Sequence, residues 1–146
     1  MFVRENNMLS YIKAILIMLK AHKGQKDKAG KPYFLHPLRV SKNLNDKRAK
    51  IVALLHDVLE DSDKYKMSDL SFLDSEQREA LGFLTHKENE DYFKYIEGIK
   101  ANKIARAVKI ADLRDNSNLS RIKNPTDKDI KRIEKYRKAM EILKGS

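Results

Sequence analysis

Hydrophobic residues recur at helical spacing along most of this chain. The first segment carries five of them three or four residues apart: Leu9, Ile12, Ile15, Leu16 and Leu19. Such spacing places the side chains on one face of a helix, so we expect that face to pack against a core. The pattern predicts a helix over residues 6–22, which Gly24 would terminate.

The rest of the chain predicts further helices separated by short polar segments. Residues 25–33 are polar and contain the helix breakers Gly30 and Pro32, so we expect a loop there. A helix should open at Leu35-His36-Pro37, because proline suits the first helical turn. Five more helices are expected at about 47–60, 75–85, 90–99, 102–119 and 126–143, with a short helical turn near Ser68.

The last predicted helix combines an apolar side with a strongly basic outer face. Its expected packed residues are Ile130, Ile133, Tyr136, Arg137, Met140 and Leu143. Across the whole chain there are only five glycines and three prolines in 146 residues, which favours an all-α fold in one domain, 1–146. A chain of this size buries roughly 70% of its unfolded surface, enough for a real core.

The absence of cysteine excludes disulfides and thiolate metal sites, so any metal must be held by nitrogen and oxygen. The apolar run from Ile12 to Leu19 is too short to span a bilayer and has no small-residue cleavage site. We therefore expect a cytoplasmic protein that is not in a membrane. The net charge of +10 suits an anionic partner, whether nucleic acid, a membrane surface or a phosphorylated small molecule, but equally a solvated lysine-rich surface.

One stretch, Leu54 to Asp61, concentrates ionisable groups at the end of a buried helix. On that helix, His56, Asp57, Glu60 and Asp61 fall within an arc of about 140°, opposite an apolar face. Three carboxylates beside one histidine repel one another unless a cation lies among them. The stretch therefore predicts a metal site.

A second polar group lies on the helix expected at 102–119. Lys109, Asp112 and Asn116 fall within about 60° of one another on that helix. Apolar neighbours surround Asp112, and a carboxylate is costly to bury without a partner. A bound cation would supply that partner.

Two imidazoles and two carboxylates can hold a borderline divalent ion such as Mn²⁺, Fe²⁺ or Zn²⁺. The predicted ligands are His36, His56, Asp57 and Asp112. Open positions would admit substrate and a water whose lowered pKa makes it a hydrolytic nucleophile. Glu60 and Asp61 would then orient that water or carry its proton.

The two other histidines have weaker expectations. His22 is interpreted mainly as a hydrogen-bonded structural histidine, with a supporting role next to the ligands as the alternative. His86 lies in a polar segment and is expected to be exposed and without a role.

The order of His36, the His56-Asp57 pair and Asp112 resembles the H…HD…D pattern of HD-domain metal-dependent phosphohydrolases. Three blocks extend the likeness: AHKGQKDKAGKPYFLHPLRV at 21–40, LLHDVLEDS at 54–62 and VKIADLRDNS at 108–117. Together they resemble the hydrolase domain of RelA/SpoT-type enzymes and of small stand-alone alarmone hydrolases such as the metazoan SpoT homologue.

This resemblance implies an HD-domain helical bundle and Mn²⁺-dependent hydrolysis of the 3′-pyrophosphate of ppGpp or pppGpp, the alarmones of the stringent response. The products would be GDP or GTP and pyrophosphate. It also implies that the four predicted ligands bind the metal, that Glu60 and Asp61 are the catalytic pair, and that Lys28 and Asn116 bind the nucleotide. Lys109 is a further candidate phosphate contact.

One position departs from that family. Members generally carry an Arg-Lys pair where this chain has Asp27-Lys28. Arginine can stack on a base and bind it, whereas aspartate cannot. Related proteins also remove phosphate from NADPH, so another phosphorylated nucleotide is an alternative substrate. The alternative of another class, a basic helical module that binds nucleic acid, rests on the charge of the last helix and leaves the spare carboxylates Glu60 and Asp61 unexplained.

Overall fold

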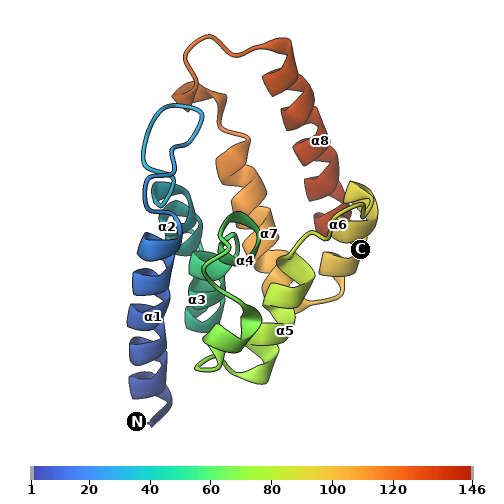
Figure 1. Cartoon of the computed structure of the whole chain (residues 1–146). Coiled ribbons are helices and arrows are strands. Elements are labelled where there is room, and N and C mark those ends of the chain that lie inside the picture. The colour runs from blue at the N-terminus through green and yellow to red at the C-terminus, as the bar shows by residue number, and fades with distance from the viewer. Residues whose placement is uncertain (1, 146) are drawn as a thin grey trace.

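The computed structural model describes residues 2–145, and the predicted all-α fold is confirmed, with no β-strand in that range (Figure 1). The expected domain boundaries at residues 1 and 146 lie outside the described residues. The α-helices are α1 (Phe2–Ala21), α2 (Leu35–Lys42), α3 (Lys47–Leu55), α4 (Val58–Asp61), α5 (Ser75–Leu84), α6 (Tyr92–Lys100), α7 (Lys103–Asn116) and α8 (Asp127–Lys144). Two short 3₁₀ helices are η1 (Met67–Leu70), near the expected turn, and η2 (Leu119–Arg121).

Helix α3 lies at the centre of the bundle. It packs against α1 and α2 on one side and against α5 and α7 on the other. Residues 51–55 are buried without interruption, as expected of a helix that is enclosed all round. Helix α8 packs on α6 and α7, on the side of the molecule opposite α1 (Figure 1). Among the described helices, none is long and apolar enough to cross a membrane.

Side-chain caps fix the starts of five helices near the predicted positions. A side-chain oxygen accepts a hydrogen bond from a backbone N–H in the first turn of α3, α5, α6, α7 and α8; the capping residues are Asp46, Asp74, Asp91, Asn102 and Thr126, respectively. These caps satisfy donors that have no partner within the helix.

The prediction of one continuous helix over 47–60 is wrong, because the helix is interrupted at His56 and Asp57. Helix α3 ends at Leu55 and α4 begins at Val58. The ring of His56 lies back against its own helix, with Nδ1 2.5 Å from the carbonyl oxygen of Ala53. The arc calculated for a continuous helix therefore does not describe this stretch.

The core-facing side of α1 was also predicted wrongly. Leu9, Ile12, Leu16 and Leu19 are 57%, 49%, 52% and 38% exposed, respectively. The buried residues are instead Ala14, Met18 and Ala21. Helix α1 is apolar on two sides, so periodicity alone does not select the side that contacts α3. In α8, Ile130 and Arg137 are likewise exposed.

Two truncations on α1 test this orientation. Met18→Ala should destabilise the protein by about 2–5 kcal/mol, because it removes a fully buried side chain and leaves a cavity. Leu16→Ala, two residues away on the exposed side, should change stability by no more than about 0.5 kcal/mol. Urea denaturation of both variants measures the difference, and a larger loss for Leu16→Ala would show that the exposed stripe is the packed face.

Candidate metal centre and adjoining pocket

The four predicted metal ligands come together from three parts of the chain. His36 lies in the first turn of α2, His56 and Asp57 lie between α3 and α4, and Asp112 lies on α7. One candidate ligand atom from each residue lies within 4.8 Å of the others. The convergence requires α2 and α7 to pack together beside the end of α3, as they do.

Both imidazoles point to the same carboxylates. His36 Nε2 lies 2.7 Å from Asp112 Oδ1, and His56 Nε2 lies 3.2 Å from the same atom. Asp57 Oδ2 lies 3.1 Å from His56 Nε2 and 3.8 Å from His36 Nε2. Two nitrogen and two carboxylate donors facing one point form a set that fits a borderline divalent ion.

The electrostatics show that positive charge is required between these groups. Burial alone would lower the pKa of His56, but the charges of Asp57 and Asp112 outweigh burial and raise it. Burial likewise opposes the raised pKa of His36, which follows from its hydrogen bonds to Asp112 and Asp115. Burial would raise the pKa of Asp57, but mainly the charge of His56 lowers it to about 2. The surrounding carboxylates therefore favour the protonated form of both imidazoles when no metal is bound.

The polar group predicted on α7 is confirmed as one contact network around Asp112. Lys109 Nζ donates to Asp112 Oδ2 at 2.9 Å, and Asn116 Nδ2 donates to Asp112 Oδ1 at 3.1 Å. The Lys109 ammonium also lies 5.3 Å from the ring centroid of Tyr95. These donors offset the cost of burying the carboxylate and hold it in one orientation.

Tyr33 is a contact of the centre that was not singled out from the sequence. Its hydroxyl donates to Asp57 Oδ2 at 2.7 Å. Burial, and after it the negative charge of Asp57, raise the pKa of Tyr33 well above its usual range. The hydroxyl therefore remains a donor at neutral pH and fixes one oxygen of the carboxylate.

Glu60 and Asp61 lie on α4, one turn after the ligand pair. The Glu60 carboxylate accepts the backbone N–H of His86, and the Asp61 carbonyl accepts from Gln25 Nε2 at 3.1 Å. Partial desolvation, and after it the charge of Asp57, raise the pKa of both carboxyls. This makes them better proton acceptors than ordinary surface carboxylates, and their catalytic role stays a prediction.

The remaining histidines differ from each other. His22 is buried: its Nδ1 lies 2.8 Å from Gln25 Oε1, whereas its Nε2 has no hydrogen-bond partner among the described residues, so both interpretations of His22 stay predictions. The expected exposure of His86 is wrong, because its ring is half-buried and stacks on Tyr95 with centroids 4.5 Å apart. Folding of the 85–91 segment onto α6 places it there, which polarity along the chain does not indicate.

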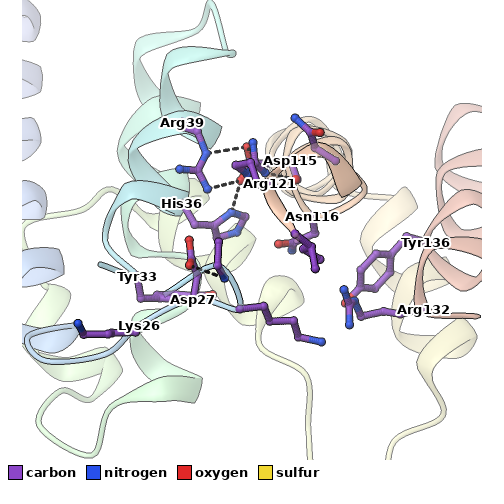
Figure 2. A pocket seen from close by; sticks show the side chains of 14 residues that line it. Lys26, Asp27, Tyr33, His36, Arg39, Asp115, Asn116, Arg121, Arg132 and Tyr136 are labelled. Carbon is purple, nitrogen blue, oxygen red and sulfur yellow. Dashed lines mark hydrogen bonds and ion pairs between the residues drawn. The ribbon is translucent and has the colours of Figure 1, made fainter. Parts of the chain in front are cut away.

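A pocket of about 390 Å³ adjoins the metal centre and shares His36 and Tyr33 with it (Figure 2). The remaining lining residues are Lys26, Asp27, Lys28, Ala29, Arg39, Asp115, Asn116, Asn118, Arg121, Ile122, Arg132 and Tyr136. The predicted substrate contacts Lys28 and Asn116 are therefore in its wall, whereas Lys109 is on the Asp112 side of the centre.

Five cationic and two acidic side chains line this pocket, so it favours an anionic ligand. Arg132 extends from α8 and is held by Asp129 at 2.9 Å, and Lys28 lies 3.8 Å from the same carboxylate. Tyr136 follows Arg132 one turn later and offers a ring beside it (Figure 2). Arg132 and Tyr136 were missed as site residues because only tertiary packing brings α8 over the loop 25–33.

Asp27, the position that departs from the family pattern, shapes the loop that forms one wall. Its Oδ1 accepts the backbone N–H groups of Ala29 and Lys31, each at 2.9 Å. This is the turn-forming role typical of aspartate. The carboxylate therefore brings both a fixed backbone and a negative charge to the pocket.

Asp115, on the last turn of α7, also lies in this pocket and was not predicted as a site residue. Its carboxylate contacts His36, Arg39 and Arg121. Burial would raise the pKa of Asp115, but the hydrogen bonds from His36 and Arg39 lower it to about 2. Figure 2 shows the His36 and Arg39 contacts as dashed lines.

Comparison with known proteins finds relatives with two names, guanosine-3′,5′-bis(diphosphate) 3′-pyrophosphohydrolase and GTP pyrophosphokinase. The chain is 41% identical over 71 residues to the guanosine-3′,5′-bis(diphosphate) 3′-pyrophosphohydrolase of Borreliella burgdorferi, a match that covers 46% of this chain and 11% of that protein. It is 33% identical over 69 residues to the enzyme of the same name from Vibrio cholerae, over 44% of this chain and 10% of that protein. The resemblance to SpoT-type hydrolases is confirmed.

The fold agrees with this resemblance. A solved structure of a metazoan SpoT orthologue that hydrolyses ppGpp superposes with a TM-score of 0.76, covering 93% of this chain and 86% of that one at 21% identity. A third relative, the GTP pyrophosphokinase of Myxococcus xanthus, is 41% identical over 54 residues, 34% of this chain and 7% of that protein. The chain thus matches only about a tenth of the length of these curated relatives. No family model matches the chain.

The raised histidine pKa values make metal affinity depend on pH. The pKa values of His36 and His56 lie above 6.5, so metal binding near neutral pH must displace their protons. Mn²⁺ affinity measured by calorimetry should therefore increase as pH rises from about 6 to 8, by up to about tenfold per pH unit for each displaced proton.

In the metal-free protein the same shifts have the opposite effect on stability. A folded-state pKa raised above the unfolded value stabilises the protein at low pH, and the stabilisation is lost as pH rises through the raised pKa. Thermal melts without metal should show this loss above about pH 6.5, and addition of Mn²⁺ should abolish it. Metal affinity and metal-free stability that are both flat across this range would contradict the assignment of His36 and His56.

Proposed function

We propose that this chain is a metal-dependent phosphohydrolase that removes the 3′-pyrophosphate of ppGpp and pppGpp, releasing pyrophosphate and leaving GDP or GTP. The observation that carries the proposal is the convergence of His36, His56, Asp57 and Asp112 at the end of a pocket lined by cations. The similarity to 3′-pyrophosphohydrolases supports the choice of substrate. The proposal includes one HD-type domain and a cytoplasmic location.

His36, His56, Asp57 and Asp112 would hold the ion, for which Mn²⁺ is proposed and Fe²⁺ or Zn²⁺ are alternatives. When bound, such an ion supplies Lewis-acid polarisation of a phosphoryl oxygen and increases the acidity of water. The chain supplies the orientation of its ligands. Tyr33 holds Asp57, while Lys109 and Asn116 hold Asp112.

Glu60 and Asp61 are proposed to manage the proton of the attacking water. Their raised pKa values make both carboxylates better proton acceptors than ordinary surface carboxylates. The backbone N–H of His86 restrains Glu60, and Gln25 restrains the Asp61 backbone. This restraint keeps the two carboxyls next to the ligands without making them ligands.

The pocket residues are proposed to bind the nucleotide. Lys28 and Asn116 line the pocket next to His36, and Arg132 and Tyr136 face them from α8. Guanidinium and ammonium groups suit phosphate oxygens, and a tyrosine ring suits a nucleobase. Lys109 was also predicted to contact a phosphate. Its ammonium group already donates to Asp112, so it would have to contact both groups at once.

A nucleotide panel with purified protein and Mn²⁺ tests the proposal. Pyrophosphate should be released from ppGpp, and His56→Ala or Asp57→Ala should reduce kcat to background, because each removes a ligand. Asp63→Ala, an exposed acidic residue that does not line the pocket, serves as the matched control and should keep full activity. Metal binding without turnover of any guanosine alarmone would reject this substrate.

A second candidate is dephosphorylation of another phosphorylated nucleotide such as NADPH, which would release orthophosphate. Asp27 in the pocket wall favours it, because the pocket lacks the arginine expected there in guanosine-specific relatives. Inclusion of NADPH in the panel, with orthophosphate and pyrophosphate measured separately, distinguishes the two. Strong salt-dependent binding of DNA or RNA without any metal requirement would instead support the nucleic-acid alternative.

Asp27→Asn isolates the effect of the charge at this position. Asparagine keeps an oxygen that can accept the Ala29 and Lys31 N–H groups, but it removes one negative charge from the pocket. For either anionic nucleotide, KM should fall about two- to threefold with kcat unchanged. This is the size of effect expected for two unit charges separated by about 7 Å in water. Steady-state kinetics at low salt measure the change, and an unchanged or raised KM would show that the charge does not oppose binding.

A further inference from the structure

Asp115 contacts a proposed metal ligand from the side opposite the metal centre. It follows Asp112 by three residues on α7, and its Oδ2 lies 2.6 Å from His36 Nδ1. The other ring nitrogen of His36, Nε2, lies 2.7 Å from Asp112 Oδ1. His36 is therefore held between two carboxylates of the same helix, and both contacts are buried.

Two arginines keep the Asp115 carboxylate in place. Arg39 donates through Nε to Oδ1 at 2.9 Å and through Nη2 to Oδ2 at 3.1 Å. Arg121 reaches the same carboxylate from η2, with Nη2 3.2 Å from Oδ1, and also donates to the Asp115 carbonyl. A carboxylate that faces two guanidinium groups is an acceptor only. The proton on this side of the His36 ring must therefore be carried by Nδ1.

We infer that Asp115 is the positioning residue of the metal centre: it fixes the His36 ring as the Nδ1–H tautomer, so that the Nε2 lone pair is directed to the ion. This inference rests on the proposed metal-dependent function and extends it to a residue outside the four ligands. Carboxylates that accept the second N–H of a ligating histidine orient the ring and increase its basicity.

The arrangement also connects the pocket to the centre. Arg39 and Arg121 line the pocket, and both contact the carboxylate that holds His36. The two arginines thus have their charge largely satisfied by Asp115. Their main role is to hold the carboxylate that supports the proposed metal ligand His36, whereas Lys28 and Arg132 contact Asp129 instead.

Metal affinity of Asp115→Asn, measured by calorimetry with Mn²⁺ and without substrate, tests the inference. The substitution keeps the size of the side chain but places an amide against two arginines and a ring N–H. Mn²⁺ affinity should fall about 10- to 100-fold, as for other residues that orient metal ligands. Asp129→Asn is the matched control: it also removes a carboxylate paired with an arginine at this pocket, and its affinity should stay within about twofold of wild type.

A charge-preserving variant separates orientation from simple attraction. Asp115→Glu retains the negative charge but moves it by one methylene group, so affinity should also fall. If Asp115→Asn binds Mn²⁺ with wild-type affinity but has a lower melting temperature, Asp115 only stabilises the fold through its ion pairs, and the inference is overturned. Full affinity in Asp115→Glu would overturn orientation as the mechanism.

The wild-type protein gives a readout that needs no variant. With diamagnetic Zn²⁺ bound, long-range ¹H–¹⁵N spectra should show that His36 carries its proton on Nδ1. A proton on Nε2, with Nδ1 on the metal, would overturn the inference even if the variants do not fold. Failure of the wild-type protein to bind either Mn²⁺ or Zn²⁺ would reject the proposed function itself, which is a different result from metal binding that ignores Asp115.

Discussion

The buried carboxylate of Asp112 is the interaction on which the rest of the site depends. His36, His56, Lys109 and Asn116 all contact it, from α2, from the α3–α4 junction and from α7 itself. A charge buried this deeply destabilises a fold unless positive groups and donors surround it. The same requirement that makes these elements pack closely also gathers the donors that suit a divalent ion.

The break between α3 and α4 gives this cluster its shape. A continuous helix would carry Glu60 and Asp61 along one face with His56, as the sequence pattern suggested. With the break, His56 hydrogen-bonds its own helix and Asp57 turns to Tyr33 and the imidazoles. The short helix α4 then holds two carboxyls with raised pKa values beside the ligands. The site therefore separates the groups suited to metal binding from those suited to proton transfer.

The arginines of the pocket are also paired with carboxylates. Most of its arginine charge is matched by Asp115 or Asp129, so the cations are held in place before any ligand arrives. Such preorganisation would limit the entropy lost when an anionic ligand binds. Asp27 shapes the loop opposite α8 through two backbone hydrogen bonds. The chain resembles SpoT-type hydrolases in sequence and shares the fold of one solved member.

The sequence by itself determined most of the helices and the four residues that converge, because hydrophobic spacing and local motifs are properties of short segments. It did not determine which side of α1 is buried, since two sides are apolar, nor that α3 ends before His56. Arg39, Asp115, Arg121 and Arg132 meet the site only through packing between segments far apart in the chain. Local patterns carry no information on such pairings, and only the tertiary structure decided them.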